Sequence, residues 1–134
     1  MAALVPTLTL TGTAADFGAA LAVSETDSIS VGAPIIGVST HSVTTTGANN
    51  IIAVAADTTK LVYIKHTGKD AGGSSVTTDL LIESTPGDIP FAKLNAEEFA
   101  WIPHYSAANS GVNGVQLEAS SGTIVVEYAV FSHT

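Results

Sequence analysis

The stretch "GTIVVEYAVF", Gly122 to Phe131, carries the clearest secondary-structure signal near the C-terminus. Neighbouring side chains of a β-strand point to opposite faces of the sheet. One face of this stretch therefore gathers large apolar side chains, those of Ile124, Val126, Tyr128 and Val130. Glu127 interrupts the other face. Alternation with period 2, in β-branched and aromatic residues, predicts a strand that buries one face in a core.

Similar short runs of Val, Ile and Thr recur along the chain, and Gly, Asn, Asp or Pro separates them about every ten residues. The runs are "TLTLT" (7–11), "SISV" (28–31), "IIGVSTHSVTTT" (35–46), "NIIAVA" (50–55), "KLVYIKH" (60–66), "SVTTDLLIES" (75–84), "IPFAKL" (89–94), "EFAWIP" (98–103) and "VNGVQLEA" (112–119). Such spacing favours a sandwich or barrel over alternating strands and helices. The sequence predicts an all-β, single-domain antiparallel β-sandwich over residues 1–134, with 1–13 as an extended N-terminal arm.

Three segments between the strands need a separate interpretation. "TAADFGAALAV" (13–23) places Phe17, Ala20 and Leu21 on one helical face, but it is short and contains Gly18, so we expect it to be extended or irregular. "GKDAGGSS" (68–75) predicts a hairpin loop at the surface. "HYSAANSGVNG" (104–114) predicts a longer loop of the kind that makes contacts at a sandwich edge.

Composition and charge narrow the function classes. The net charge is −8, from twelve acids, four lysines and no arginine, which makes nucleic acid and anionic membrane surfaces poor ligands. The chain has no cysteine, no apolar run of membrane-spanning length and no signal-like N-terminus, so we expect a soluble protein made in a cytoplasm. Only 12% of residues are charged, which suggests that partners cover part of the surface.

Paired acids in "LNAEEFAWIP" (94–103) resemble a catalytic dyad. Neighbouring side chains diverge in a strand, so Glu97 and Glu98 cannot share a proton or bracket a substrate. We therefore place both acids in the turn before a strand. Phe99 and Trp101 then share one face of that strand, as core residues or as a subunit contact.

No other pattern indicates a chemical site. The histidines at 41, 66, 104 and 133 show no HxH, HxxxH or HExxH spacing, although His66 and His104 with a carboxylate are conceivable zinc ligands. Asp57, Asp70 and Asp88 lie outside any calcium-loop pattern, and nucleophile and phosphate-binding motifs are absent. We expect no catalytic, metal or cofactor site, and a protein that is not an enzyme.

The second half of the chain resembles the small all-β virion proteins of tailed bacteriophages, especially aquatic and cyanobacterial ones. The likeness lies in the order of "KLVYIKHTG", "VTTDLLIES", "LNAEEFAWIP" and "LEASSGTIVVEYAVF", and it covers roughly Lys60 to Phe131. Those proteins usually have glycine where this chain has Glu97. The resemblance implies a jelly-roll-like sandwich, assembly into oligomers and a structural role at the capsid exterior.

These observations lead to one main hypothesis and two alternatives. The main one is a capsid decoration, or cement, protein, a homo-oligomer with a trimer favoured, that binds the major capsid protein through Ala2 to Thr13, the 104–114 loop and an aromatic face. The candidate core or interface residues are Phe99, Trp101, Tyr105, Tyr128 and Phe131. The alternatives are a tail, connector or fibre module, and a carbohydrate-binding sandwich in which Trp101, Tyr105 and Tyr63 stack on a sugar.

Overall fold

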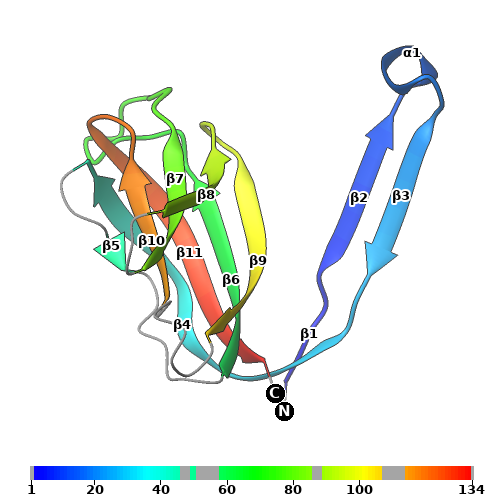
Figure 1. Cartoon of the computed structure of the whole chain (residues 1–134), viewed down its shortest axis with the longest axis horizontal. Coiled ribbons are helices and arrows are strands. Elements are labelled where there is room, and N and C mark those ends of the chain that lie inside the picture. The colour runs from blue at the N-terminus through cyan, green and yellow to red at the C-terminus, as the bar shows by residue number, and fades with distance from the viewer. Residues whose placement is uncertain (1, 46–48, 51–57, 86–88, 107–113, 134) are drawn as a thin grey trace.

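Strands dominate the computed structural model, which describes residues 2–45, 49–50, 58–85, 89–106 and 114–133 (Figure 1). Its elements are β1 (Ala2–Leu4), β2 (Thr7–Gly12), α1 (Ala14–Phe17), β3 (Leu21–Thr26), β4 (Ile29–Thr44), β5 (Asn49–Asn50), β6 (Thr58–His66), β7 (Leu80–Thr85), β8 (Ile89–Leu94), β9 (Phe99–Ser106), β10 (Gly114–Ala119) and β11 (Thr123–His133). The all-β class predicted from the sequence is confirmed.

The strands form two main sheets and one separate hairpin. One sheet has the order β1-β4-β11-β6-β9, the other has β5-β10-β7-β8, and β2 pairs only with β3. From β4 onward the pairs are antiparallel and nested, β4 with β11, β5 with β10, β6 with β9 and β7 with β8. Eight strands paired in this nested way across two sheets make a jelly roll. The predicted jelly-roll-like sandwich is therefore confirmed.

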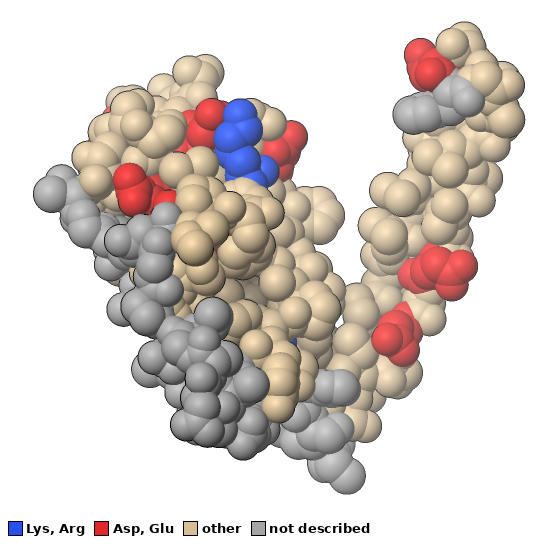
Figure 2. Space-filling view, viewed as in Figure 1, with Lys and Arg blue, Asp and Glu red and all other residues tan. Residues whose placement is uncertain are grey.

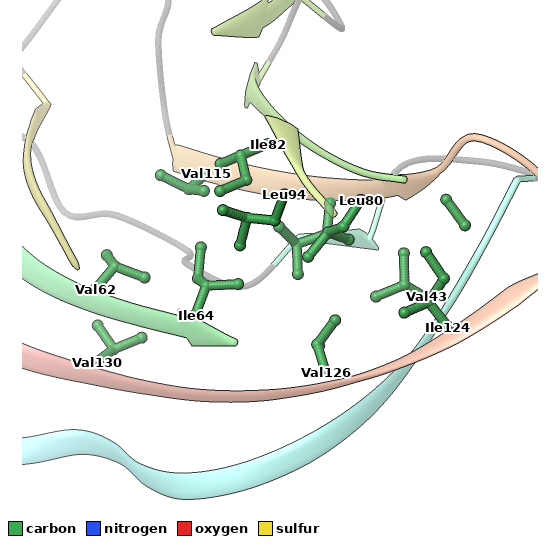
Figure 3. Close-up of a cluster of buried hydrophobic side chains, with 12 residues drawn as sticks. Val43, Val62, Ile64, Leu80, Ile82, Leu94, Val115, Ile124, Val126 and Val130 are labelled. Carbon is green, nitrogen blue, oxygen red and sulfur yellow. The ribbon is translucent and has the colours of Figure 1, made fainter. Parts of the chain in front are cut away.

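The core lies between the two sheets and is aliphatic (Figure 3). It includes the fully buried Val62, Ile64, Leu80, Ile82, Val115, Leu117, Ile124, Val126 and Val130. The face predicted for "GTIVVEYAVF" is confirmed, because Ile124, Val126 and Val130 are buried and Tyr128 packs against the cluster. In β6, Val62 and Ile64 enter the core, and Leu61 and Tyr63 point to the other face of their sheet.

An arm made of β2, α1 and β3 stands away from the sandwich, to which β1 and the start of β4 connect it (Figure 1). The arm expected over residues 1–13 corresponds to β1 and the first strand of this hairpin. The extended reading of "TAADFGAALAV" was wrong at Ala14–Phe17, which form one helical turn, and right from Leu21 onward. Gly18 ends the turn at φ 73°, and its N–H donates to the Ala14 carbonyl at 2.9 Å.

Three predicted boundaries were wrong. "SISV" and "IIGVSTHSVTTT" belong largely to one strand, β4, whose register against β11 shifts at three places between Tyr128 and His133, so that the intervening residues stay within the strand. "SVTTDLLIES" becomes a strand only at Leu80, because residues 76–79 cross from the sheet of β6 to the sheet of β7. The loop predicted from His104 begins later, since β9 extends to Ser106.

Other predicted segments are confirmed or lie outside the described residues. The 68–75 hairpin loop is confirmed, with a bridge between Lys69 and Ser75. Within it, the Asp70 carboxylate accepts hydrogen bonds from the N–H groups of Gly72 and Ser74 at 2.9 and 2.8 Å. Residues 51–57 of the "NIIAVA" region and 107–113 of the predicted long loop are not described.

Candidate functional site

The two adjacent acids lie in the turn that precedes β9, as predicted. The Asn95 N–H and its side-chain Nδ2 donate to Glu98 Oε2 at 2.7 and 3.0 Å. These hydrogen bonds hold the pKa of Glu98 below its ordinary value, and the one from the Asn95 backbone has the larger effect. A general acid at neutral pH needs a raised pKa instead. Glu97 adopts φ 72°, the left-handed conformation that favours glycine.

The two histidines weighed as zinc ligands lie near opposite ends of the β6–β9 ladder, His66 at the end of β6 and His104 on β9. His66 is fully buried, its Nε2 donates to the Thr78 carbonyl at 2.7 Å and its Nδ1 accepts from the Gly68 N–H at 2.9 Å. Both ring nitrogens of His66 are therefore engaged. His104 is in register with Lys60, six residues away along the ladder, which at the rise of a strand is roughly 20 Å. Among the described residues, no three His, Asp or Glu side chains gather as a metal site would require.

An aromatic surface covers the outer face of the five-stranded sheet. The register sets Tyr63 opposite Trp101, and Phe131 opposite Leu61. Because Val62 and Val130 point into the core, these neighbours point away from it. The rings of Trp101 and Phe131 are in contact, with centroids 6.2 Å apart.

The five predicted core or interface residues divide between the two faces of that sheet. Tyr128 is the core member, packed against the aliphatic cluster. Phe99 and Tyr105 are 62% and 58% exposed, and Trp101 and Phe131 are half-buried. We call the outward set the aromatic face, which comprises Tyr63, Phe99, Trp101, Tyr105 and Phe131. The sequence predicted that Phe99 and Trp101 share a face, and the structure places that face outside the core.

The arm is amphipathic, which the sequence analysis did not recognise. Opposite residues of an antiparallel pair share a face. Here Leu8 is opposite Glu25, Leu10 is opposite Val23, and Gly12 is opposite Leu21. One face, which we call the leucine face, therefore carries Leu8, Leu10, Leu21 and Val23. The other carries Thr7, Thr9, Thr11, Ser24 and Thr26.

The leucine face remains largely uncovered. The exposed fractions of Leu8, Leu10 and Leu21 are 50%, 44% and 37%. A two-stranded hairpin without a packed face is marginally stable in water. Contiguous exposed apolar residues on a soluble protein typically mark an interaction site. The arm therefore presents an apolar face that a partner surface would cover.

The leucine face and the aromatic face border the same opening. A hollow of about 430 Å³ is lined by Pro6, Thr7 and Leu8 of the arm side and by Tyr63, Phe99 and Trp101 of the sandwich. An adjoining hollow of about 510 Å³ adds Glu25 and Ile29 and shares Trp101. Figure 2 shows the arm and the sandwich as two limbs of a V, with largely uncharged atoms along the opening.

Comparison with known proteins gives no family assignment. A scan of protein-family models, a search of curated proteins and a search of solved structures each found no match for this chain. Within the part of the chain that the structure describes, no helix has the length and apolar character needed to cross a membrane.

Proposed function

We propose that this protein is a structural component of a bacteriophage virion, a capsid decoration protein that binds the mature head as a homo-oligomer, with a trimer favoured. Its partner in the virion is the major capsid protein, and it is made in the host cytoplasm and placed on the capsid exterior. It contacts neither DNA nor membrane.

The exposed leucine face of the arm is the observation that carries this proposal. A projecting amphipathic hairpin beside an exposed aromatic face gives the molecule two apolar surfaces for protein contacts. Decoration requires such contacts, both between copies and with the shell. An enzyme or a small-ligand carrier would instead use a concave, enclosed site with convergent polar groups.

Three further features support the proposal. Jelly rolls are common in viral capsid proteins, although the same fold serves other functions, including lectins. Glu97 adopts a positive φ at the position where the phage proteins that this chain resembles usually have glycine. The charge of −8 without arginine would keep the protein away from packaged DNA and on the outside.

Binding to shells tests the proposal directly. The purified protein is mixed with expanded empty shells assembled from the major capsid protein of the same virion, and bound protein is measured after sedimentation. We expect saturable binding at symmetric positions and a trimeric mass by light scattering. Replacing Trp101 by Ser should weaken binding, whereas Val38→Ser, which removes an apolar side chain that is 75% exposed elsewhere, should not. Failure to bind expanded shells would contradict the decoration role, and a hexameric ring would favour a tail or connector part.

A carbohydrate-binding role is the second candidate, because three aromatic residues of the outer face, Tyr63, Trp101 and Tyr105, are accessible. Aromatic rings on an exposed face are the surfaces on which sugars stack. Trp101 is the only tryptophan, so its fluorescence reports on this face alone. Saturable quenching by a sugar, in a protein that stays monomeric, would replace the decoration proposal with this one.

A further inference from the structure

We infer that the opening between the arm and the sandwich is an exchange site, in which the leucine face of one copy packs against the aromatic face of another. The inference rests on the homo-oligomer part of the proposed function and identifies the surfaces that make the oligomer. Repeated around a two-fold or a three-fold axis, the same contact covers every arm.

The arm requires a cover that its own sandwich does not supply. Leu8 lines the hollow beside Trp101, yet half of its surface stays exposed. Leu10 and Leu21 lie farther along the hairpin, and neither lines either of the two hollows described above. The aromatic face is equally uncovered at Phe99. Each molecule therefore presents two apolar surfaces, one with large rings and one with leucines.

A charge of opposite sign lies beside each of the two apolar surfaces, an acid on the arm and a lysine on the sandwich. Residues 1–59 contain no lysine or arginine, and the arm and its base carry Asp16, Glu25 and Asp27. All four lysines lie between residues 60 and 93. On the leucine face, Glu25 is opposite Leu8, and on the aromatic face, Lys65 is opposite Phe99. Exchange would bring Glu25 of one copy towards Lys65 of another.

Glu127 on the sandwich lies beside Lys65. Glu127 is in register with Lys65 on the same outer face, and no ion pair joins the two. Glu127 lowers the net positive charge of this region, so Lys65 contributes register and specificity more than affinity. The apolar contact supplies the attraction, and the charges favour the arm over other apolar surfaces.

β-Proteins also assemble by pairing the edge strands of their sheets. On the side of the sandwich where β8 and β9 lie, prolines oppose such pairing. β8 and β9 are edge strands of the two sheets. Each contains a proline, Pro90 and Pro103, which lacks an N–H to donate to an added strand. Copies that meet on this side therefore associate through faces, which is the contact that exchange makes.

Disulfide trapping between two variants tests the inference, because the chain has no cysteine of its own. Leu10→Cys, on the leucine face, and Phe99→Cys, on the aromatic face, are co-expressed with tags of different mass and then oxidised. A disulfide between the two variants joins different copies. We expect a band of two chains that carries both tags and shifts to single chains on reduction. Thr9→Cys, on the opposite face of the same strand, serves as the matched control and should give little mixed product with Phe99→Cys.

Two further measurements separate the outcomes. A single chain carrying both Leu10→Cys and Phe99→Cys that forms only a monomeric disulfide would show that the arm folds onto its own sandwich, and would overturn the inference. An oligomer by light scattering without mixed cross-links would also overturn it while leaving the proposed homo-oligomer intact. A wild-type protein that stays monomeric would overturn both.

Discussion

Removing the leucines of the arm should weaken self-association by a predictable amount. In the variant Leu8→Ser/Leu10→Ser/Leu21→Ser, the apolar surface that an oligomer would cover is lost. The exposed fractions of 50%, 44% and 37% together amount to a little more than one leucine side chain. Burying one such side chain completely contributes about 1.5–3 kcal/mol. Each arm should therefore lose about 2–4 kcal/mol, a dissociation constant roughly 30- to 1000-fold higher.

Analytical ultracentrifugation over a concentration series measures this change. The matched control is Thr9→Ser/Thr11→Ser, which alters the opposite face of the same strand at two exposed positions that do not line the hollow. Its dissociation constant should remain that of the wild type. At concentrations low enough to dissociate the wild type, the unfolding temperature of the sandwich should be the same in both variants, because none of the altered residues belongs to the core cluster.

Either of two results would refute this reasoning. If the leucine variant associates as tightly as the wild type, the arm is not the association surface. If the threonine variant weakens association equally, the hairpin acts through its backbone or its overall stability and not through its apolar face.

Three further predictions concern the sandwich. Gln116→Leu should lower stability to urea by about 1.5–3 kcal/mol, because it removes the 2.9 Å hydrogen bond to the buried Glu83 carboxylate, and adding Glu83→Leu should recover part of the loss. Glu98→Gln should make the free energy of unfolding depend less on pH in acid. The lowered pKa of Glu98 gives a stability that is full above about pH 4.5 and is lost as the pH falls through the pKa of the folded state. The same pH dependence in both proteins would contradict the Asn95 contacts. Glu97→Gly should leave the free energy of unfolding unchanged or slightly raised, whereas Glu97→Val should lower it by about 1 kcal/mol or more, since φ is 72°.

Many strands of the sandwich were predictable because burial of one face in the core leaves apolar residues at every second position. In β11, alternation separates Ile124 and Val126 from Glu127, and the structure buries the first two. In β6, both faces are apolar. Alternation therefore predicted which side chains share a face, and it did not predict which face is buried. The core takes Val62 and Ile64, and leaves Tyr63 outside. Patterning therefore identifies strands reliably, and it fixes the buried face only where the other face is polar.

The same ambiguity explains the position of the aromatic residues. β9 carries Ala100 and Ile102 on one face and Phe99 and Trp101 on the other. Large rings usually make the larger contribution to a core. Here Ala100 and Ile102 pack against the aliphatic cluster, and Phe99 is 62% exposed. The local sequence cannot show that the space between two sheets is already filled by side chains from distant strands.

An arm was expected over residues 1–13, but its pairing as a hairpin with an apolar face was missed for a different reason. "TLTLT" correctly predicted a strand, but its pairing partner lies in a segment rich in Ala that also fits a helix. The helical alternative survives only as Ala14–Phe17, because Gly18 in the left-handed conformation ends it after one turn. Recognising that Leu10 pairs with Val23 requires the turn geometry, and only the pairing reveals that one face gathers Leu8, Leu10, Leu21 and Val23.

The low fraction of charged residues is consistent with the two exposed apolar faces. A protein with 12% charged residues must expose many uncharged side chains, and scattered apolar residues would need no explanation. Here Leu8, Leu10 and Leu21 share one face of the arm, and Phe99 lies on the aromatic face of the sandwich. Other exposed apolar residues, Val5, Val38, Ile89 and Phe91, lie outside these two faces. The arm and the aromatic face differ from them because Leu8, Phe99 and Trp101 line the same hollow, and this is why the exchange of arms is the contact to test first.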